Sequence, residues 1–366
     1  GKSLYIMTID FSDAFGSIPH KLIKKNLREL GFSNCFVKSV MSSYKRSSTR
    51  VVSNGRLSDE IVFRKGVKQG CPMSPTLFNI CLDSLVSKLD SLKDDGYHWF
   101  DRSTVVQAYA DDIILFSDTE VGMNNLIEAV ESFCLYAGNM RVNSKKCQSF
   151  TYIINNGSRQ VLNDNFVIQG GVVDNVSILG SASYLGLPIA AKASRRKRHV
   201  FRKIEEMTNA VSKITSSSLR VTQAVDAIKR FVLPTVDYEL MANTAPVNGL
   251  RRLDQHIRGK LSKMIKASGI PIDWFYTSRR DGGLNLQCLC ERQKALTIRL
   301  YVGLVESNDK SVRNIIKASD DAELIFRDAE VDENSPFLGI KLKDNGSING
   351  RLNRGTSNLL SRCVKS

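Results

Sequence analysis

The nine residues Ala108–Phe116, AYADDIILF, set two adjacent carboxylates between two short apolar runs. The second run, Ile113–Phe116, is rich in β-branched and aromatic residues and is bounded by polar ones, so we predict a buried strand. Because neighbouring side chains of a strand point to opposite faces, Asp111 and Asp112 cannot both simply face solvent. Buried charge is costly unless a cation compensates it, and a hairpin tip that holds a divalent metal is one solution.

A second apolar strand that ends in a carboxylate lies upstream. Leu4–Phe11 has the sequence LYIMTIDF and carries Asp10. Two strands that bring carboxylates to one sheet edge could clamp two Mg²⁺ ions roughly 3.5–4 Å apart, which serves in-line phosphoryl or nucleotidyl transfer. Mg²⁺ suits carboxylate and phosphate oxygens. The alternative is that Asp10 and Asp111 are ordinary strand-end and turn residues, and the pairing of two such strands disfavours it.

The composition bounds the class of protein. With 366 residues, of which 42% are hydrophobic and 24% charged, the chain can form two or three globular domains. No apolar run approaches the roughly 18 residues of a membrane span. The N-terminus lacks the pattern of a signal peptide, so we expect no membrane insertion and no secretion. The eight Cys and four His are dispersed, which argues against a structural zinc site and fits a reducing compartment.

The net charge of +15 is concentrated in one region. Residues 192–266 contain 17 Lys and Arg but 6 Asp and Glu. A local surplus of this size indicates a polyanion such as nucleic acid, although a solvated helical surface stays an alternative. The cluster Arg195-Arg196-Lys197-Arg198 could also be a nuclear localisation signal.

Hydrophobic periodicity and turn residues predict the order of the elements. Because a central strand seldom opens a domain, we expect the strand at Leu4 to have further structure upstream in a longer protein. Pro234 should break its helix. The predicted helices cover 19–30, 33–48, 76–89, 124–137, 192–212, 221–238, 249–266 and 291–305. Two strands are predicted over 50–52 and 60–63 around the turn Ser53-Asn54-Gly55-Arg56, a strand-rich region over 148–190 with a turn at Gly170-Gly171, and a loop over 274–285.

Two segments near the acidic strands could contact a nucleotide. Phe15 follows Asp10 by five residues, where an aromatic ring could pack against a sugar and exclude a 2′-hydroxyl; a role in the core is equally open. The loop Arg64–Pro75 carries two Gly and two Pro before a helix, and Gly there lets the backbone approach a phosphate or base. Such loops are common, so this signal is weak by itself.

Five sequence blocks, in this order, resemble the palm of a reverse transcriptase. The blocks are DFSDAF at Asp10–Phe15, QGCPMSP at Gln69–Pro75, YADD at Tyr109–Asp112, Asn143 with Lys146, and YLG at Tyr184–Gly186. The match runs from residue 1 to about residue 190. The basic region and the loop that ends with DGGL at residue 284 are similar to the thumb of non-LTR retrotransposon polymerases, the R2-like branch most of all.

The resemblance implies an α+β fold, a right-hand polymerase palm followed by a helical thumb. The palm would be an antiparallel sheet with packed helices. Residues 1–190 would form this palm with partial fingers, residues 191–306 a basic helical thumb, and residues 307–366 a polar C-terminal extension. The family's fingers blocks before the first palm strand are absent from this sequence, and so is an endonuclease or zinc-binding segment after the thumb. We therefore expect this chain alone to polymerise poorly.

The resemblance also implies a role for each matching residue. Asp10, Asp111 and Asp112, with the carbonyl of Phe11, would bind two Mg²⁺ ions, with Mn²⁺ as the alternative. Phe15 would be the steric gate that selects deoxyribonucleotides.

Further residues of the blocks would contact the substrates. Gln69 and Gly70 would lie along the incoming nucleotide and template, and Lys146 would protonate the leaving pyrophosphate. Tyr184, Leu185 and Gly186 would grip the primer end. The thumb would hold the RNA–DNA duplex by its phosphates, through Arg195, Arg196, Lys197, Arg198, Arg202 and Lys203.

The implied function is RNA-directed DNA polymerisation by a non-LTR retrotransposon protein. Its partners would be an RNA template, a DNA primer or target and dNTPs, and it would act in the nucleus or accompany the element RNA in the cytoplasm. Two alternatives stay open: a catalytically impaired RNA-binding remnant, and an intron-encoded maturase with a similar palm. Primer extension on an RNA template separates the first of these from a polymerase.

Overall fold

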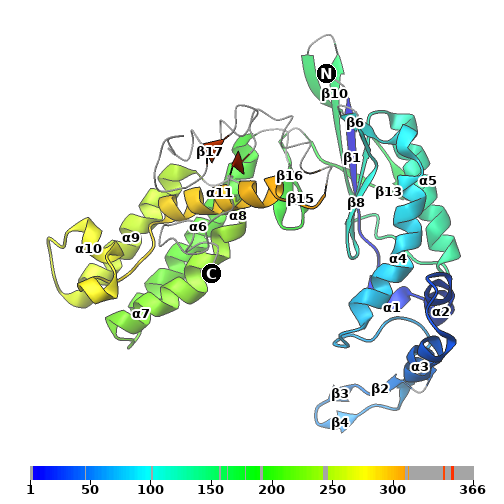
Figure 1. The fold of residues 1–366 in the computed structure, drawn as a ribbon, viewed down its shortest axis with the longest axis horizontal. Helices are drawn as coiled ribbons and strands as arrows, with labels where there is room; N and C mark the ends of the chain where they lie inside the picture. Colours follow the sequence, from blue (N-terminus) through cyan, green and yellow to red (C-terminus); the bar gives the residue numbers. More distant parts are fainter. Residues whose placement is uncertain are drawn as a thin grey trace. The chain divides into compact units, whose positions relative to one another are not determined.

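A six-stranded sheet carries the predicted acidic hairpin (Figure 1). The strand order is β11-β10-β1-β9-β8, and β14 pairs with β10. All pairs are antiparallel except β10 with β14. The strands are β1 Leu4–Ile9, β8 Val106–Tyr109, β9 Asp112–Ser117, β10 Gln148–Asn155, β11 Ser158–Leu162 and β14 Asp174–Asn175.

The structure is a computed structural model, and the chain in it divides into two compact units, residues 1–195 and 196–366. Each unit is described by itself. The structure describes residues 3–45, 47–99, 102–155, 158–162, 164–177, 179–189, 193–241, 246–309, 312, 341–342 and 348–349.

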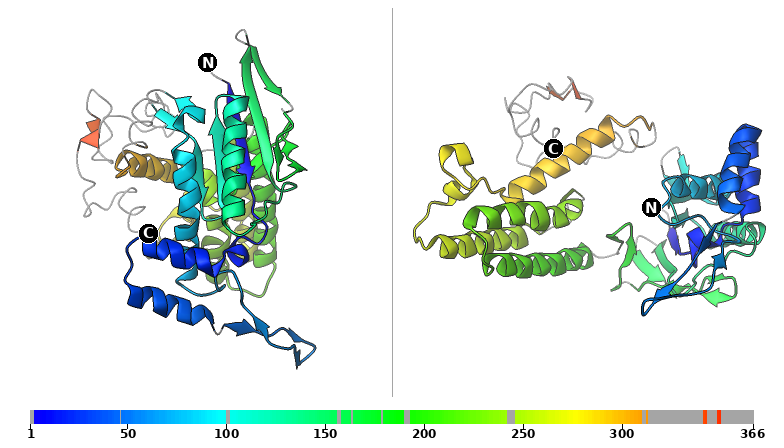
Figure 2. Two further views of the ribbon diagram at one scale, coloured as in Figure 1. Left: turned by 90° about the vertical axis from the view of Figure 1, so that its right-hand side faces the viewer. Right: turned by 90° about the horizontal axis from the view of Figure 1, so that it is seen from below.

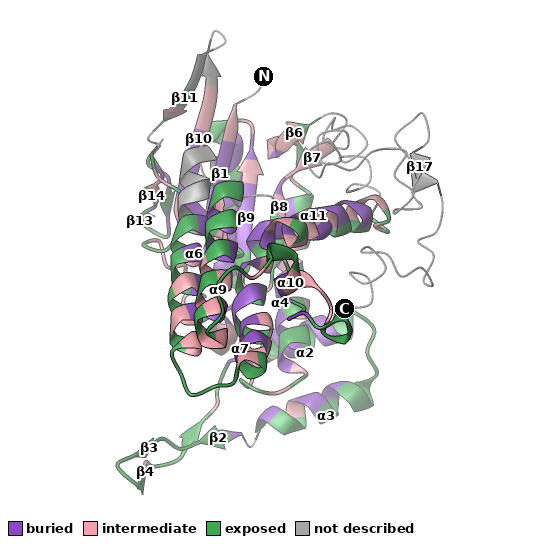
Figure 3. Cartoon of the chain, turned by 90° about the vertical axis from the view of Figure 1, so that its left-hand side faces the viewer, coloured by how far each residue is buried: buried purple, intermediate pink, exposed green. Residues whose placement is uncertain are grey.

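Alternate residues of the central strands enter two apolar clusters. The cross-strand partners Met7 and Leu115 are fully buried in the larger cluster, on the face that helices cover (Figure 2). Ile6 and Ile114 belong to a smaller cluster, which they share with Phe150. Because side chains alternate along a strand, this two-sided burial explains why both strands are almost continuously apolar (Figure 3).

Five helices accompany the sheet in the described part of the first unit, besides the 3-10 turn η1 at Lys93–Asp95. Helices α4 and α5 pack against each other and contact the sheet, and α2 packs on α4. The predicted helices are confirmed, and the α+β class with them. The bounds are α1 Ala14–Ser17, α2 His20–Glu29, α3 Asn34–Lys45, α4 Ser74–Asp90 and α5 Glu120–Tyr136.

Short hairpins project from this unit. The predicted turn at Asn54-Gly55 is confirmed, and the two residues have positive φ values of 49° and 75°, as the central residues of tight hairpin turns often do.

 The pairing differs from the prediction of two strands over 50–52 and 60–63, because the chain forms two separate two-residue ladders instead of one. The ladders pair β2 with β5 and β3 with β4. Their bounds are β2 Ser48–Thr49, β3 Val52–Ser53, β4 Arg56–Leu57 and β5 Ile61–Val62.

Three further hairpins complete the first unit within the described residues. The strand-rich character predicted for 148–190 is confirmed by two of them and by β10, β11 and β14. The hairpins are β6 Tyr97–Trp99 with β7 Arg102–Thr104, β12 Val167–Ile168 with β13 Gly171–Val172, and β15 Ala182–Tyr184 with β16 Leu187–Ile189.

The second unit is helical over its described part, up to residue 309. Its apolar cluster joins the buried faces of α6, α7, α9 and α11, with Phe275 of α10. The predicted loop over 274–285 is partly wrong, because Trp274–Tyr276 belong to the one-turn helix α10. The bounds are α6 Ala193–Thr215, α9 Val247–Ile265, α10 Ile272–Tyr276, η4 Arg279–Asp281 and α11 Leu289–Val305.

The predicted break at Pro234 is confirmed. A proline lacks the N–H that an α-helix needs and its ring clashes with the preceding turn. The chain accordingly leaves α-helical geometry before and around this residue, passing through a π-helical and then a 3-10 segment. The segments are α7 Val221–Ala227, η2 Ile228–Val232, η3 Leu233–Val236 and α8 Asp237–Met241.

Most of the predicted C-terminal extension, 307–366, lies outside the described residues. The short strands β17 Lys341–Leu342 and β18 Ile348–Asn349 pair with each other there. Among the described helices, none has both the length and the apolar character that crossing a membrane requires.

Candidate active site

The β8–β9 hairpin carries two carboxylates at its tip. Tyr109 pairs with Asp112, so Ala110 and Asp111 form a two-residue turn. Ala110 has a φ of 52°, in the left-handed region that residues with a side chain rarely adopt. Its side chain packs against the larger apolar cluster. The core therefore holds this turn, and with it both carboxylates, in a defined place.

Asp10 lies beside this tip, at the end of the neighbouring strand. Ile9 of β1 and Ile113 of β9 are cross-strand partners, and such partners have Cα atoms about 4.5–5.5 Å apart. Asp10 follows Ile9 and Asp112 precedes Ile113, so antiparallel pairing brings both to the same end of the strand pair. Residues roughly a hundred positions apart in the chain thus meet at one sheet edge.

The three carboxylates interact electrostatically. The pKa of Asp112 is raised above its ordinary value, first by burial and then by the negative charges of Asp111 and Asp10. Asp10 has a cationic neighbour, Lys146, whose Nζ lies 3.9 Å from its Oδ2. Three negative charges beside one lysine leave an excess that a divalent cation would neutralise. Oxygen donors of this kind fit Mg²⁺ or Mn²⁺.

The segment Arg141–Cys147 holds the backbone of Asp10 from the side. The N–H of Asn143 donates to the Asp10 carbonyl at 2.8 Å, and the N–H of Ser12 donates to the Arg141 carbonyl at 2.8 Å. The Asp10 N–H points to Sγ of buried Cys147, 3.4 Å away. Neither backbone bond uses the Phe11 carbonyl, which the sequence resemblance assigns as a metal ligand.

Phe15 lies on α1, five residues after Asp10. Its half-buried ring stacks on Phe78 of α4, with 4.3 Å between ring centroids and an interplanar angle of 11°. The ring therefore has a fixed position against α4. The stacking shows that Phe15 contributes to the core. Because the ring is only half-buried, the predicted contact with a nucleotide stays a prediction.

The loop before α4 is fastened to α1. The N–H of Gly66 donates to the Ile18 carbonyl at 2.7 Å, and the N–H of Val67 donates to the Phe15 carbonyl at 2.8 Å. Gly66 lies so close to Gly16 that a Cβ on it would be 2.8 Å from the Gly16 Cα. Only glycine permits this approach, and it places the loop next to Phe15.

Gln69 and Gly70 occupy an exposed turn of this loop. Gly70 has a φ of 81°, and a Cβ on it would meet no atom within 4 Å. Lys68 anchors the turn, because its Nζ donates to the Ser43 carbonyl at 2.7 Å and lies over the Tyr44 ring. The turn is therefore held at its base and open at its tip.

The hairpin β15–β16 contacts the acidic strands directly. Tyr184 pairs with Leu187, so Leu185 and Gly186 form its turn, with φ values of 48° and 78°. The Tyr184 hydroxyl donates toward the carbonyl oxygens of Gln107 and Asp112, at 3.4 and 3.5 Å. Tyr184, one of the three predicted primer-grip residues, thus lies beside the carboxylate hairpin.

The comparison with protein families agrees with this geometry. Residues 1–189, more than half of the chain, match the family model described as reverse transcriptase (RNA-dependent DNA polymerase). This chain belongs to the reverse transcriptase family. Its members are RNA-directed DNA polymerases, a class of nucleotidyltransferases, and the sheet with its packed helices is the palm of such a polymerase.

Similar curated proteins are polyproteins of R2 retrotransposons, which are non-LTR elements. The chain is 28% identical over 293 residues to the Pol polyprotein of the type-2 element R2DM of Drosophila melanogaster, covering 79% of this chain and 27% of that protein. It is 26% identical over 311 residues to an R2 polyprotein of Popillia japonica, covering 84% and 50%. The chain therefore spans no more than half the length of these relatives.

Solved structures with some likeness are telomerases. The apo telomerase of Candida tropicalis gives a TM-score of 0.39 at 13% identity, covering 87% of this chain and 52% of that one. The telomerase of Candida albicans with an RNA fragment gives 0.36 at 10% identity, covering 86% and 50%.

The basic residues predicted to bind nucleic acid fall into two groups. Residues 195–198 belong to α6, but their side chains lie outside the described part of the chain. Arg202 is exposed and pairs with Glu206, 3.4 Å from Nε to Oε1. Lys203 is less exposed, and its Nζ lies 2.6 Å from Oε1 of Glu239, which is 1% exposed. Lys203 therefore stabilises the helical unit internally.

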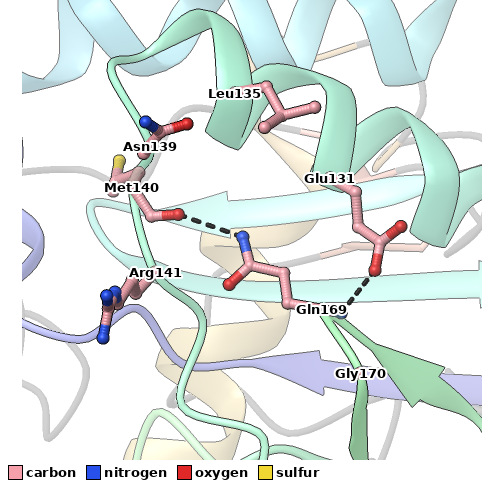
Figure 4. A pocket seen from close by; sticks show the side chains of 7 residues that line it. All are labelled: Glu131, Leu135, Asn139, Met140, Arg141, Gln169 and Gly170. Carbon is pink, nitrogen blue, oxygen red and sulfur yellow. Dashed lines mark hydrogen bonds between the residues drawn. The ribbon is translucent and has the colours of Figure 1, made fainter.

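Gln169 is a residue of the reverse transcriptase palm whose role has no signal in the amino-acid sequence (Figure 4). Gln169, in the β12–β13 turn, has a φ of 48°. Its Oε1 accepts the Val142 N–H at 2.9 Å, its Nε2 donates to the Met140 carbonyl at 3.0 Å, and its own N–H donates to Glu131.

These bonds connect Gln169 to the acidic edge of the sheet. Val142 forms an isolated bridge with Phe11, the residue after Asp10. Gln169 therefore positions the segment that holds the Asp10 backbone. A cavity of about 450 Å³ lies here, lined by Glu131, Leu135, Asn139, Met140, Arg141, Gln169 and Gly170. The Gly170-Gly171 pair indicated a turn in the sequence, but a glutamine clamp has no sequence signal of its own.

Proposed function

We propose that this chain forms the polymerase part of a non-LTR retrotransposon protein and extends a primer 3′-hydroxyl with dNTPs on an RNA template. The observation that supports this most is the meeting of Asp10 with Asp111 and Asp112 at one sheet edge. The family adds the reaction class. The template, primer and dNTPs are the partners that this reaction requires. The protein would act in the nucleus, where the target DNA is.

The proposed reaction joins the primer oxygen to the α-phosphorus of the dNTP and breaks the bond from that phosphorus to the bridging oxygen of pyrophosphate. Two Mg²⁺ ions, when bound, would acidify the hydroxyl and neutralise charge on the leaving group. Asp10, Asp111, Asp112 and the Phe11 carbonyl would hold them. The main contribution of the protein is then positioning and charge stabilisation.

Lys146 has a second role in this proposal. Its side chain is 68% exposed and its Nζ lies 3.9 Å from Asp10 Oδ2, so the ammonium group can approach a triphosphate placed over the carboxylates. There it would donate a proton to the departing pyrophosphate. A Lys146→Met variant would then lose rate and keep its Mg²⁺ requirement.

The other predicted residues would select and hold the substrates. Phe15, fixed by its stacking on Phe78, would exclude a 2′-hydroxyl. The open turn at Gln69 and Gly70 would lie along the base pair being formed. Tyr184, which reaches the Asp112 carbonyl, would hold the primer end through its hairpin.

The test is primer extension on an RNA template with Mg²⁺. We expect weak extension by the chain and a loss of about 10²–10³-fold in Asp111→Asn, the cost of removing one electrostatic contribution at a reacting centre. Asp83→Asn is the matched control, because Asp83 is an exposed carboxylate on α4; it should extend normally. Equal rates in Asp111→Asn and wild type would refute the proposal.

Two other outcomes identify the alternatives. RNA binding that is tight and salt-dependent, without any extension, indicates a catalytically impaired RNA-binding protein. Selective binding of one structured intron RNA over an unrelated RNA of equal length indicates the maturase. Binding assays on the same preparation therefore accompany the extension assay.

A further inference from the structure

The helical unit contains a group of metal-ligating atoms from residues that have no role in the proposed polymerase site. Asp254 lies on α9, Cys288 caps the N-terminus of α11, and Cys290 lies in its first turn. One ligand atom from each lies within 4.8 Å of the others. Asp254 is 5% exposed and the two cysteines are half-buried. A buried carboxylate beside two thiols needs a physical explanation, because a charge without compensation is costly there.

The spacing of these atoms suits one tetrahedral ion. With Zn–S near 2.3 Å and Zn–O near 2.1 Å, two ligand atoms on adjacent corners lie about 3.6 Å apart. Sγ of Cys288 lies 3.4 Å from Oδ2 of Asp254. Sγ of Cys290 belongs to the same group, in which all three ligand atoms lie within 4.8 Å of one another.

The carboxylate is oriented by a neighbouring backbone group. The N–H of Leu289, between the two cysteines, donates to Oδ2 of Asp254 at 3.0 Å. Ligating carboxylates are commonly held by such hydrogen bonds. This bond alone would make Asp254 a cap of α11, but a cap does not account for two thiols gathered around the same carboxylate.

Two cationic side chains lie near the proposed ligands. The thiolate is the form of cysteine that binds metals. Arg251 and Arg258 lie within electrostatic reach of Cys290 and Asp254, respectively. With a divalent ion bound, two thiolates and one carboxylate leave a single negative charge, which these arginines can compensate.

We propose that Asp254, Cys288 and Cys290 bind a zinc-type divalent cation that joins α9 to the start of α11. Two sulfur donors select Zn²⁺ over Mg²⁺, so this ion differs from the ions of the polymerase site. The fourth position belongs to water or an added ligand. The proposal is independent of the polymerase reaction.

The test is a titration of the metal-free 366-residue chain with Co²⁺, followed by displacement with Zn²⁺. We expect one Co²⁺ per chain with sulfur-to-cobalt charge-transfer absorption, which Zn²⁺ removes. Cys288→Ser and Cys290→Ser should weaken Zn²⁺ binding by more than the about 10–100-fold that loss of a supporting partner costs. Cys35→Ser is the matched control, an exposed cysteine on α3, and should bind like wild type.

A second measurement covers variants that fail to fold. In the wild-type chain, bound Zn²⁺ should slow alkylation of Cys288 and Cys290 and leave Cys35 unprotected, as mapped by mass spectrometry. Asp254→Asn keeps an acceptor for the Leu289 N–H, so it should fold and yet bind Zn²⁺ more weakly. No sulfur-to-cobalt band, or unchanged alkylation of both cysteines in excess Zn²⁺, overturns the proposal.

Discussion

At the scale of single residues, the acidic edge stores unfavourable electrostatic energy that a cation would release. Asp112 has a raised pKa because it is partly desolvated and faces Asp111 and Asp10. A carboxyl group whose pKa is higher in the folded state binds more protons there than in the unfolded chain. Its contribution to stability is therefore present at pH below its ordinary pKa and is lost as pH rises through the raised value.

Asp112→Asn tests this balance. Without metal above pH 6, we expect the variant to have a slightly higher Tm than wild type, since it removes a repelling charge; the gain is small because Asp112 is solvent-exposed and water screens it. Mg²⁺ should raise the Tm of wild type more than that of the variant. Thermal unfolding with and without Mg²⁺ measures both, and an equal Mg²⁺ effect on the two proteins contradicts the prediction.

Phe15→Val tests sugar selection. A smaller side chain leaves room for a 2′-hydroxyl, so kcat/KM for a ribonucleotide relative to its deoxy form should rise by about tenfold or more. Loss of the stacking on Phe78 should also lower the Tm. Phe78→Leu removes the same stacking and serves as the control: if it changes sugar selection as much, Phe15 acts only through packing.

Sequence reasoning works at this scale when neighbours in the chain carry the signal. The pair Asp111-Asp112 between apolar runs indicated the site and the strand that carries it. Asp254 could not be connected to Cys288 and Cys290 in the same way, since more than thirty residues separate it from them and the three ligands form no known sequence motif. The dispersed cysteines therefore argued against a zinc site, although folding brings two of them to one carboxylate.

At the scale of elements, the loop before α4 depends on a glycine contact. The close approach of Gly66 to Gly16 and the left-handed φ of Gly66, 88°, both exclude a side chain. The periodicity of the apolar residues predicted the helices, but it missed the first turn of α5, where Thr119 caps the helix by accepting the Gly122 N–H at 3.0 Å. It also missed the two-residue ladders, which are too short to have a period.

Gly66→Ala should therefore destabilise the fold by about 1–3 kcal/mol, the cost of backbone strain at one residue, and by more if the Gly16 contact cannot adjust. Gly70→Ala is the matched variant, with a φ of 81° and no atom within 4 Å of the added Cβ. Denaturant unfolding measures the loss of stability in each variant, and the difference between the two losses is the cost of disturbing the contact between Gly66 and Gly16. Equal losses would show that the close approach contributes nothing.

At the scale of the whole molecule, positive charge serves both folding and binding. Lys203 pairs with buried Glu239, whereas Arg202 is exposed on the same helix. The surplus of Lys and Arg indicated nucleic-acid binding in the sequence, but composition cannot tell which cations are used internally. That distinction depends on tertiary partners such as Glu239, which follows Lys203 by 36 residues.

Lys203→Met and Arg202→Gln should therefore differ. Lys203→Met leaves Glu239 buried without its cation and should cost about 3–5 kcal/mol of stability, most of it recovered by adding Glu239→Leu. Arg202→Gln should change stability little and lower the salt slope of RNA binding by about one. Unfolding curves and salt-dependent RNA titrations measure these effects, and a reversed pattern would contradict the assignment.

The position of β1 in the sheet has a consequence for how the protein is made. Leu4 pairs with Tyr152, and Tyr5 pairs with Ser117, so the central strand emerges from the ribosome long before either flanking strand exists. Both of its edges must wait for translation of more than a hundred residues, and contacts of such long range form slowly. An apolar strand whose edges stay unpaired during synthesis is prone to aggregate. Expression at low temperature or with chaperones should therefore raise the soluble yield.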